Sequence, residues 1–274
     1  MKKVIKALAL AATMVCGAMS AQAATVNIGG LNVPTGAHFE VASIYENVIT
    51  GVGQTLSGVG EVTQINGQAI STLCAGCELT YSFSGYVVTA ITATEVRFSG
   101  GIIKVYLDFG GAATDFNPFL SANSAADLAR ATDGTLFLTL AGHSVNAAGD
   151  TFIGSGTNIG LANAVGNGSG LADVVRGAGL GIAQSNFDTN SIAALFGSAF
   201  TDFQIGSSFS SVFVPHTAEC VGALAFTGAE CLSGSSDFRG LVIPEPESLA
   251  LFGVALLGLV ASTKRRNKAV EAAV

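Results

Sequence analysis

Short runs of alternating apolar and polar residues recur through the middle of this chain and constrain its fold more than any other feature. The runs are residues 79–83, 86–89, 95–98, 102–107, 135–140, 211–214, 223–226 and 238–243. Alternation with a period of two is typical of a β-strand that buries one face. Turns are predicted at Asn66-Gly67, Ser99-Gly100-Gly101 and Asp133-Gly134. Because no regular helices separate the runs, we predict an all-β fold, an antiparallel β-sandwich.

Two segments have helical spacing instead, and one is rich in glycine. The apolar residues of 191–203 fall at intervals of three and four, which predicts a helix packed on the sheet. Residues 124–130 predict a shorter helix, with Ser124 as its N-cap and Asp127 as the partner in a capping box. The glycine-rich stretch 149–181 fits neither a dinucleotide-binding fingerprint nor a P-loop, so we predict a flexible loop there.

The first 23 residues have the order of a secretory signal peptide. Three lysines precede an apolar run, and Ala21 and Ala23 form the small-residue site after which cleavage is predicted. An uncleaved membrane anchor is the alternative, but the run is shorter than the roughly 17 to 25 residues of a spanning helix. We therefore expect export through the Sec translocon and removal of residues 1–23 by signal peptidase.

The C-terminal end has three parts in a set order: Pro244-Glu245-Pro246, an uncharged stretch at 248–263, and the basic residues Lys264, Arg265 and Arg266. Prolines lack a backbone donor, so the first part is predicted to be an extended, unpaired spacer. As a helix the second part would rise about 24 Å, against a bilayer core of about 30 Å. The basic residues that follow predict that 248–263 is a short transmembrane helix whose C-terminal end lies in the cytoplasm. The rest of the chain would then lie outside the cytoplasm.

This order of features resembles the PEP-CTERM sorting signal. The resemblance covers the last 30 or so residues and implies recognition by an exosortase, a membrane transpeptidase-like enzyme of Gram-negative bacteria that make exopolysaccharide. An ordinary single-pass anchor is the alternative. The predicted organisation is therefore a signal peptide at 1–23, a β-rich extracellular domain at 24–243 and a sorting tail at 244–274. The resemblance implies nothing about the activity of the domain.

The charge of residues 24–243 excludes one class of partner. This stretch holds sixteen acidic and five basic residues, a net charge of −11. A surface of that sign repels phosphate backbones, so we expect no nucleic-acid binding.

Four cysteines remain once residues 1–23 are removed: Cys74, Cys77, Cys220 and Cys231. An even number in an exported chain indicates disulfides, and we favour the local pairs Cys74–Cys77 and Cys220–Cys231. A redox C-x-x-C site is disfavoured because a strand, not a helix, is predicted to follow Cys77. A zinc site of four thiolates, or of His216 with Cys220, is the remaining alternative.

Residue patterns for catalysis or ligand binding are weak. His38, His143 and His216 lie far apart, and neither a G-x-S-x-G nor an H-E-x-x-H motif occurs, although a triad could assemble around His143. With no tryptophan and four tyrosines, an aromatic platform for glycans would be thin. The turn aspartates have no calcium-loop order; they are Asp108, Asp115, Asp133 and Asp150.

We therefore expect a non-enzymatic protein without a cofactor or metal. It would be anchored transiently in the inner membrane, cut by the exosortase, and passed to the cell surface or extracellular matrix as a structural protein of a biofilm or floc, where exopolysaccharide is a candidate partner. A secreted glycan- or calcium-binding adhesin module is the first alternative, and a secreted hydrolase is the second.

Overall fold

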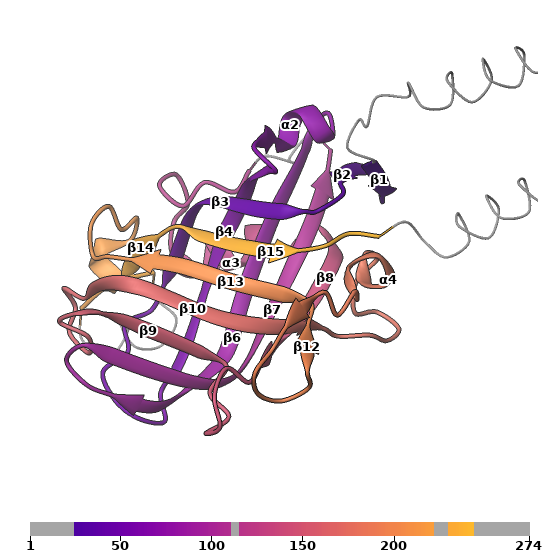
Figure 1. The fold of residues 1–274 in the computed structure, drawn as a ribbon. Helices are drawn as coiled ribbons and strands as arrows, with labels where there is room; N and C mark the ends of the chain where they lie inside the picture. Colours follow the sequence, from indigo (N-terminus) through magenta and orange to yellow (C-terminus); the bar gives the residue numbers. More distant parts are fainter. Residues whose placement is uncertain (1–24, 111–114, 222–229, 244–274) are drawn as a thin grey trace, which may run out of the picture.

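The computed structural model describes residues 25–110, 115–221 and 230–243 (Figure 1). The predicted signal peptide and sorting tail lie outside the described residues. Among the residues that are described, no helix is both long enough and apolar enough to cross a membrane.

The described chain is mostly β, and its pairings are antiparallel. The strands are β1 (Thr25–Ile28), β2 (Leu31–Pro34), β3 (His38–Glu46), β4 (Thr55–Ile65), β5 (Gln68–Ala69), β6 (Cys77–Ile91), β7 (Glu95–Phe109), β8 (Thr135–His143), β9 (Phe152–Thr157), β10 (Val165–Val174), β11 (Ile192–Ala193), β12 (Phe200–Thr201), β13 (Phe203–Phe209), β14 (Leu232–Gly234) and β15 (Ser236–Gly240). The helices are α2 (Ile70–Leu73), α3 (Ser124–Ala131), α4 (Gln184–Phe187) and the 3-10 turn η1 (Thr217–Glu219). The predicted all-β class is thus confirmed at this level.

Eight strands form a closed, barrel-like sheet. The order runs β3, β4, β6, β7, β8, β10, β13 and β15, and β15 pairs again with β3. Figure 1 shows β3, β15, β13 and β10 crossing in front of the steeper β6 and β7. The two halves face each other as the layers of a sandwich would, but the β3–β4 and β8–β10 pairings join them. The predicted sandwich of two separate sheets is therefore not confirmed.

Aromatic side chains fill the interior near the end of the closed sheet that α4 covers. Phe187 of α4 is fully buried, and its ring centroid lies 5.5 Å from that of Phe39, 5.6 Å from Phe203 and 6.2 Å from Phe137. These rings come from α4, β3, β13 and β8. Phe187 therefore joins strands from both halves of the sheet.

The turn predicted at Ser99-Gly100-Gly101 is a bend inside the long strand β7. The runs 79–83 and 86–89 belong to β6, and 95–98 and 102–107 belong to β7. Gly85 faces the Gly100-Gly101 pair, and all three glycines have positive φ. A Cβ on Gly101 would lie 2.2 Å from the ring of Tyr86. The glycines thus let both strands bend together over an aromatic ring, where we predicted a reversal at 99–101. The turn predicted at Asn66-Gly67 does join β4 to β5.

The flexible loop predicted for 149–181 is wrong, since this stretch contains β9 and β10. These strands pair from Val165↔Thr157 to Gly170↔Phe152. A Cβ on Gly156 would lie 2.1 Å from the carbonyl oxygen of Val165, and one on Gly168 would lie 2.3 Å from the ring of Phe152. Gly156 lets the two backbones approach closely, and Gly168 leaves room for a phenyl ring. Composition alone does not reveal that glycines have these functions in a strand.

The helix predicted at 191–203 is also wrong. The segment forms the β11–β12 hairpin, with Gly197 at positive φ between the two strands. Asp202 holds the ends of this segment, because its carboxylate accepts hydrogen bonds from the backbone N–H groups of Thr189 and Val174. Leu195 is 93% exposed and Phe200 is 51% exposed, so only the end of the apolar stripe, Phe203 at the start of β13, packs in the interior. The run 211–214 is not a strand, and 223–226 lies outside the described residues.

Candidate functional site

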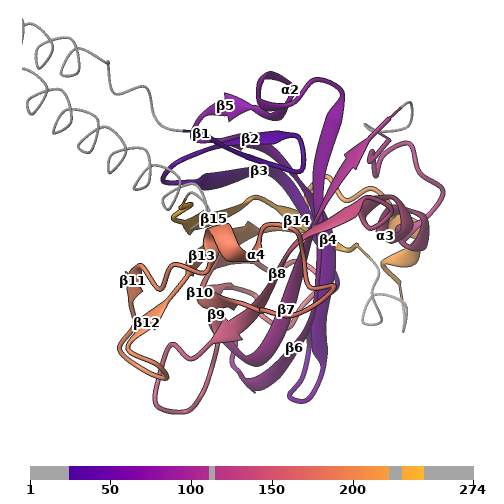
Figure 2. The same ribbon diagram turned by 90° about the vertical axis from the view of Figure 1, so that its right-hand side faces the viewer.

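Three segments that are distant in sequence meet on the outer face of the closed sheet. They are α3, the stretch around η1, and Glu230 just before β14. Helix α3 is anchored by Thr80 of β6, whose hydroxyl donates to the carbonyl of Ala131 at 2.8 Å. A small apolar cluster of Tyr45, Val59, Phe116 and Ala131 lies beneath it. In Figure 2 α3 lies on the opposite side of the molecule from the β11–β12 hairpin.

The predicted helix at 124–130 is confirmed as α3, but its cap differs from the prediction. Asn123 is the N-cap, and its side chain accepts a hydrogen bond from the Ala126 backbone N–H at 2.9 Å. Ser124 lies inside the helix and hydrogen-bonds the Glu219 carboxylate. Asp127 is therefore free of a capping role and turns its side chain toward η1.

Asp127, His216 and Glu230 bring three metal-binding groups together, and we name them the Asp-His-Glu cluster. One donor atom from each lies within 4.8 Å of the other two. The Asp127 Oδ2 and His216 Nε2 atoms are 2.6 Å apart. Asp127 is fully buried and Glu230 is 2% exposed. Apart from the contact of the two carboxyl groups with each other, one oxygen of each, Asp127 Oδ1 and Glu230 Oε2, has no hydrogen-bond partner.

Burial controls the protonation of this region. Removal from water raises the pKa of Glu230 to about 9, with further contributions from its hydrogen bond and charge repulsion with Asp127. Next to it, the hydrogen bond from Ser124 lowers the pKa of Glu219. Two carboxyl groups on one surface thus have pKa values displaced in opposite directions.

The contacts of His216 do not have the geometry of a catalytic triad. Ser121 Oγ lies 3.1 Å from His216 Nε2, the same nitrogen that meets Asp127. A serine triad needs the two ring nitrogens for two separate partners, one for the carboxylate and one for the hydroxyl. We therefore describe these residues as a group of two carboxyl groups and one imidazole, and not as a serine triad.

His143, around which a triad was considered, has both ring nitrogens engaged. Nδ1 lies 2.7 Å from Asp173 Oδ2, and Nε2 lies 2.8 Å from the carbonyl oxygen of Phe196. Burial opposes protonation, but the hydrogen bonds to Asp173 and Phe196 outweigh it and raise the pKa of His143. The nitrogen that would activate a serine is thus held by the backbone of the β11–β12 hairpin.

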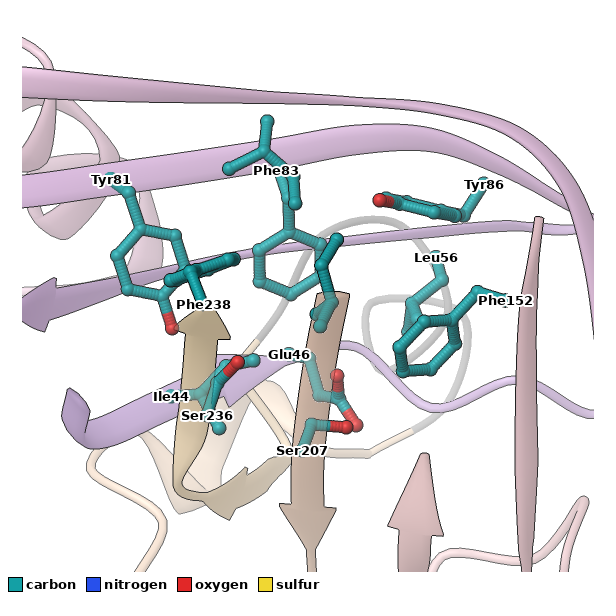
Figure 3. A pocket seen from close by; sticks show the side chains of 12 residues that line it. Ile44, Glu46, Leu56, Tyr81, Phe83, Tyr86, Phe152, Ser207, Ser236 and Phe238 are labelled. Carbon is teal, nitrogen blue, oxygen red and sulfur yellow. The ribbon is translucent and has the colours of Figure 1, made fainter. Parts of the chain in front are cut away.

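A second buried acid lies inside the closed sheet. The Glu46 carboxyl lies near Ser207, Ser236 and the ring of Phe83 in a cavity of about 30 Å³ (Figure 3). Burial raises the pKa of Glu46 to about 8. A cavity of this size accommodates about two water molecules rather than an organic ligand. We therefore expect Glu46 to affect the stability of the fold rather than to bind a ligand.

The structure forms both local disulfide pairs that the spacing predicts. The Cα atoms of Cys74 and Cys77 are 5.8 Å apart, and those of Cys220 and Cys231 are 5.2 Å apart. The zinc sites considered for these thiolates, including His216 with Cys220, are contradicted because the sulfurs are bonded to each other. His216 meets Asp127 and Glu230 instead.

Three of the turn aspartates lie close to one another, because burial and the charges of Asp115 and Asp108 raise the pKa of Asp133. Asp150 accepts hydrogen bonds from Thr89 Oγ1 and Asn146 Nδ2, both at 2.7 Å, and so fastens its own turn to β6. Asp115 lies 3.9 Å from the Arg130 guanidinium. Asp108 accepts the next residue's backbone N–H. Sequence reasoning missed Asp127 and Glu230 as site residues, because no motif links positions that are so far apart.

An exposed groove lies next to the Asp-His-Glu cluster. It has a volume of about 390 Å³, and it is lined by Ser43, Tyr45, Phe119, Ser210, Val212, Phe213, Ser233 and Gly234. Phe213 is 81% exposed and has a φ of 60°, a conformation that bulky residues rarely adopt. The aromatic residues on its rim are mainly phenylalanines, whereas the sequence argument considered only tryptophan and tyrosine.

The comparisons with known proteins concern the C-terminal end. Residues 242–266 match the family model of the PEP-CTERM protein-sorting motif. No curated protein and no solved structure matches the chain. The sorting residues Pro244, Glu245, Pro246, Lys264, Arg265 and Arg266, and the predicted cleavage site at Ala21 and Ala23, lie outside the described residues.

The matched motif implies export, a C-terminal membrane anchor before processing, and exosortase as the processing partner. It also implies a final location at the cell surface or outside the cell. It covers 25 residues and so classifies the tail rather than the closed sheet. Residues 242–266 of this chain are thus a PEP-CTERM protein-sorting motif.

Proposed function

We propose that the chain is a non-catalytic structural protein of the cell surface or exopolysaccharide matrix, delivered there by an exosortase. The match of residues 242–266 to the PEP-CTERM sorting motif carries the proposal. The signal peptide starts export, and the tail holds the chain in the inner membrane with residues 24–243 outside. Cutting of the tail then releases the closed sheet to the surface, where it contributes to a biofilm or floc.

Two features of the described residues support a non-catalytic role. Both ring nitrogens of His143 are engaged, and His216 meets Ser121 and Asp127 through a single nitrogen. Neither histidine is thus arranged to take a proton from a serine with one ring nitrogen while a carboxylate holds the other. Disulfides also suit a protein that acts outside the cytoplasm.

Replacing Glu245 by alanine is expected to leave the tail uncut and the protein in the membrane fraction. The Pro-Glu-Pro spacer is the segment that the sorting motif presents for recognition, whereas Glu247 lies just beyond it. The Glu247→Ala variant, which removes the same charge two residues later, is expected to be processed normally. Mass spectrometry of the protein from surface and membrane fractions measures the C-terminus of each variant, in cells with and without the exosortase.

Two results would contradict these expectations. Recovery of an intact tail through Val274 from the surface of cells that contain the exosortase would refute the processing proposal. Equal processing of the Glu245→Ala and Glu247→Ala variants would refute the role of the spacer.

A glycan-binding module is the second candidate function, and the groove beside the Asp-His-Glu cluster favours it. Its lining combines the exposed rings of Phe119 and Phe213 and the largely buried Tyr45 with the hydroxyl groups of Ser43 and Ser210. Apolar faces with a few placed polar groups are the usual composition of a binding site for a small organic unit. A volume of about 390 Å³ lies within the range of such sites.

The Phe213→Ala variant is expected to bind matrix polysaccharide roughly fivefold more weakly, since an aromatic contact is worth about 1 kcal/mol. Its thermal midpoint should not change, because Phe213 is largely exposed. Phe200→Ala is a matched control, since Phe200 is 51% exposed but does not line the groove. Calorimetric titration with polysaccharide fragments measures both variants. Equal binding by the two, or no saturable binding by the unchanged protein, would eliminate this candidate.

A further inference from the structure

The Asp-His-Glu cluster holds three ligand groups from separate segments at one buried point. Asp127 comes from α3, His216 from the residue before η1, and Glu230 from the residues before β14. We propose that this cluster binds a first-row divalent transition-metal ion, for which Zn²⁺ is the best-suited probe.

The spacing of the donor atoms matches a metal site. Zinc bonds to nitrogen and oxygen are about 2.0 to 2.2 Å long, so the ligand atoms around one tetrahedral ion lie about 3.3 to 3.5 Å apart. The three donor atoms here lie within 4.8 Å of one another, and the closest pair, Asp127 Oδ2 and His216 Nε2, is 2.6 Å apart. Side-chain rotations that move each donor atom by about 1 Å would therefore place all three around one ion.

Two buried oxygen atoms lack a partner, and this observation is independent of the spacing. Apart from the contact of the two carboxyl groups with each other, neither Asp127 Oδ1 nor Glu230 Oε2 has a hydrogen-bond partner, and both residues are at least 98% buried. A buried polar atom without a partner costs about 1 to 3 kcal/mol. A cation between the two carboxyl groups would supply the missing interaction. The net charge of −11 on residues 24–243 would in addition raise the local concentration of cations.

The donor set selects among ions. Calcium takes six to eight oxygen ligands, whereas this site offers two carboxyl groups and an imidazole. An imidazole with carboxylates suits zinc and similar transition ions. Three protein ligands leave one position of a tetrahedron for water.

The bound ion would act as a cross-link. It would join α3 to the segment that carries η1 and to Glu230, next to the disulfide between Cys220 and Cys231. The residues just before η1 form one wall of the exposed groove; they include Ser210, Val212 and Phe213. Metal binding would therefore stabilise the surface next to the groove.

Calorimetric titration and thermal unfolding of the untagged protein, after treatment with a chelator, test the proposal. We expect one equivalent of Zn²⁺ per chain and a rise in Tm with added Zn²⁺, because an ion that binds the folded state stabilises it. Ca²⁺ and Mg²⁺ at the same concentration should have no comparable effect. The absence of saturable Zn²⁺ binding by the unchanged protein would overturn the proposal.

Two variants locate the site. Glu230→Gln keeps the shape of the side chain and is expected to weaken Zn²⁺ binding at least tenfold. His143→Gln is the matched control, because His143 also pairs with a carboxylate, Asp173, at 2.7 Å but belongs to no three-ligand group among the described residues. It should bind Zn²⁺ as the unchanged protein does. Unaltered binding by Glu230→Gln, or equal loss in both variants, would show that the ion binds elsewhere.

Discussion

At pH 7 the Glu46→Gln variant is expected to have a free energy of unfolding roughly 3 kcal/mol larger than that of the unchanged protein. Glu46 is 7% exposed, and burial raises its pKa from 4.5 to about 8. To remain folded at neutral pH, the protein must either bury a charge or keep a proton that the unfolded chain would release. Each unit of pKa difference corresponds to about 1.36 kcal/mol over the pH range in which it applies. Glutamine has the same shape and no proton to keep.

The sign of the pH dependence follows from the same pKa values. Between pH 4.5 and pH 8 the folded protein binds a proton at Glu46 that the unfolded chain has lost. The contribution of Glu46 to stability therefore falls as the pH rises through this window and levels off above pH 8. Urea unfolding at several pH values is expected to show that the two proteins are similar near pH 4.5 and differ most at pH 8.

Glu95→Gln is the matched control for this measurement. The Glu95 side chain is 39% exposed and pairs with Arg97 at 2.7 Å on the surface. Exposed ion pairs contribute at most about 1 kcal/mol, so this variant should be slightly less stable or unchanged. A Glu46→Gln variant that is less stable than the unchanged protein at pH 7 would show that the buried carboxyl group makes a favourable interaction in its ionised form.

Replacing Phe187 by alanine is expected to reduce the free energy of unfolding by roughly 3 to 5 kcal/mol. The side chain is fully buried, and its ring lies within 6.2 Å of those of Phe39, Phe203 and Phe137. Alanine would leave a cavity between strands from both halves of the closed sheet. Because native stabilities are themselves only about 5 to 15 kcal/mol, a loss of this size should shift the denaturation midpoint strongly.

The Phe200→Ala variant separates this effect from a general loss of aromatic surface. Phe200 lies in β12 and is 51% exposed, so its removal should change stability by no more than about 0.5 kcal/mol. Denaturant unfolding at one pH measures both variants. Similar free energies of unfolding for the two variants would show that the packing of Phe187 against the closed sheet contributes little to stability.

Local patterns predicted those parts of the fold that depend on near neighbours. The alternation at 79–83 and 102–107 marked strands, because a strand with one buried face must alternate. The capping pattern at 124–130 marked α3, although the N-cap is Asn123 rather than Ser124. The short separations between Cys74 and Cys77, and between Cys220 and Cys231, favoured local pairing, and the structure forms these disulfides.

Other local patterns misled, because a distant contact decided the conformation. The stripe at 191–203 has helical spacing, yet hydrogen bonds from Thr189 and Val174 to Asp202 fix its end as an extended hairpin. The glycines of 149–181 are compatible with a loop, but Gly156 and Gly168 lie where a neighbouring strand or the ring of Phe152 leaves no room for a Cβ. Composition cannot distinguish a glycine in a loop from one in a crowded strand.

The amino-acid sequence alone was enough to assign the sorting tail. Pro244, Glu245 and Pro246, the apolar stretch and the basic end follow one another in linear order, and a family model matches residues 242–266 directly. Linear order also accounts for the strands, whose alternation depends on adjacent residues. Only the tertiary structure closed the sheet and assembled the Asp-His-Glu cluster, because β15 must reach β3, and His216 and Glu230 must reach Asp127, across long separations in the chain. Contacts of that kind form through packing and leave no motif in the residues that make them.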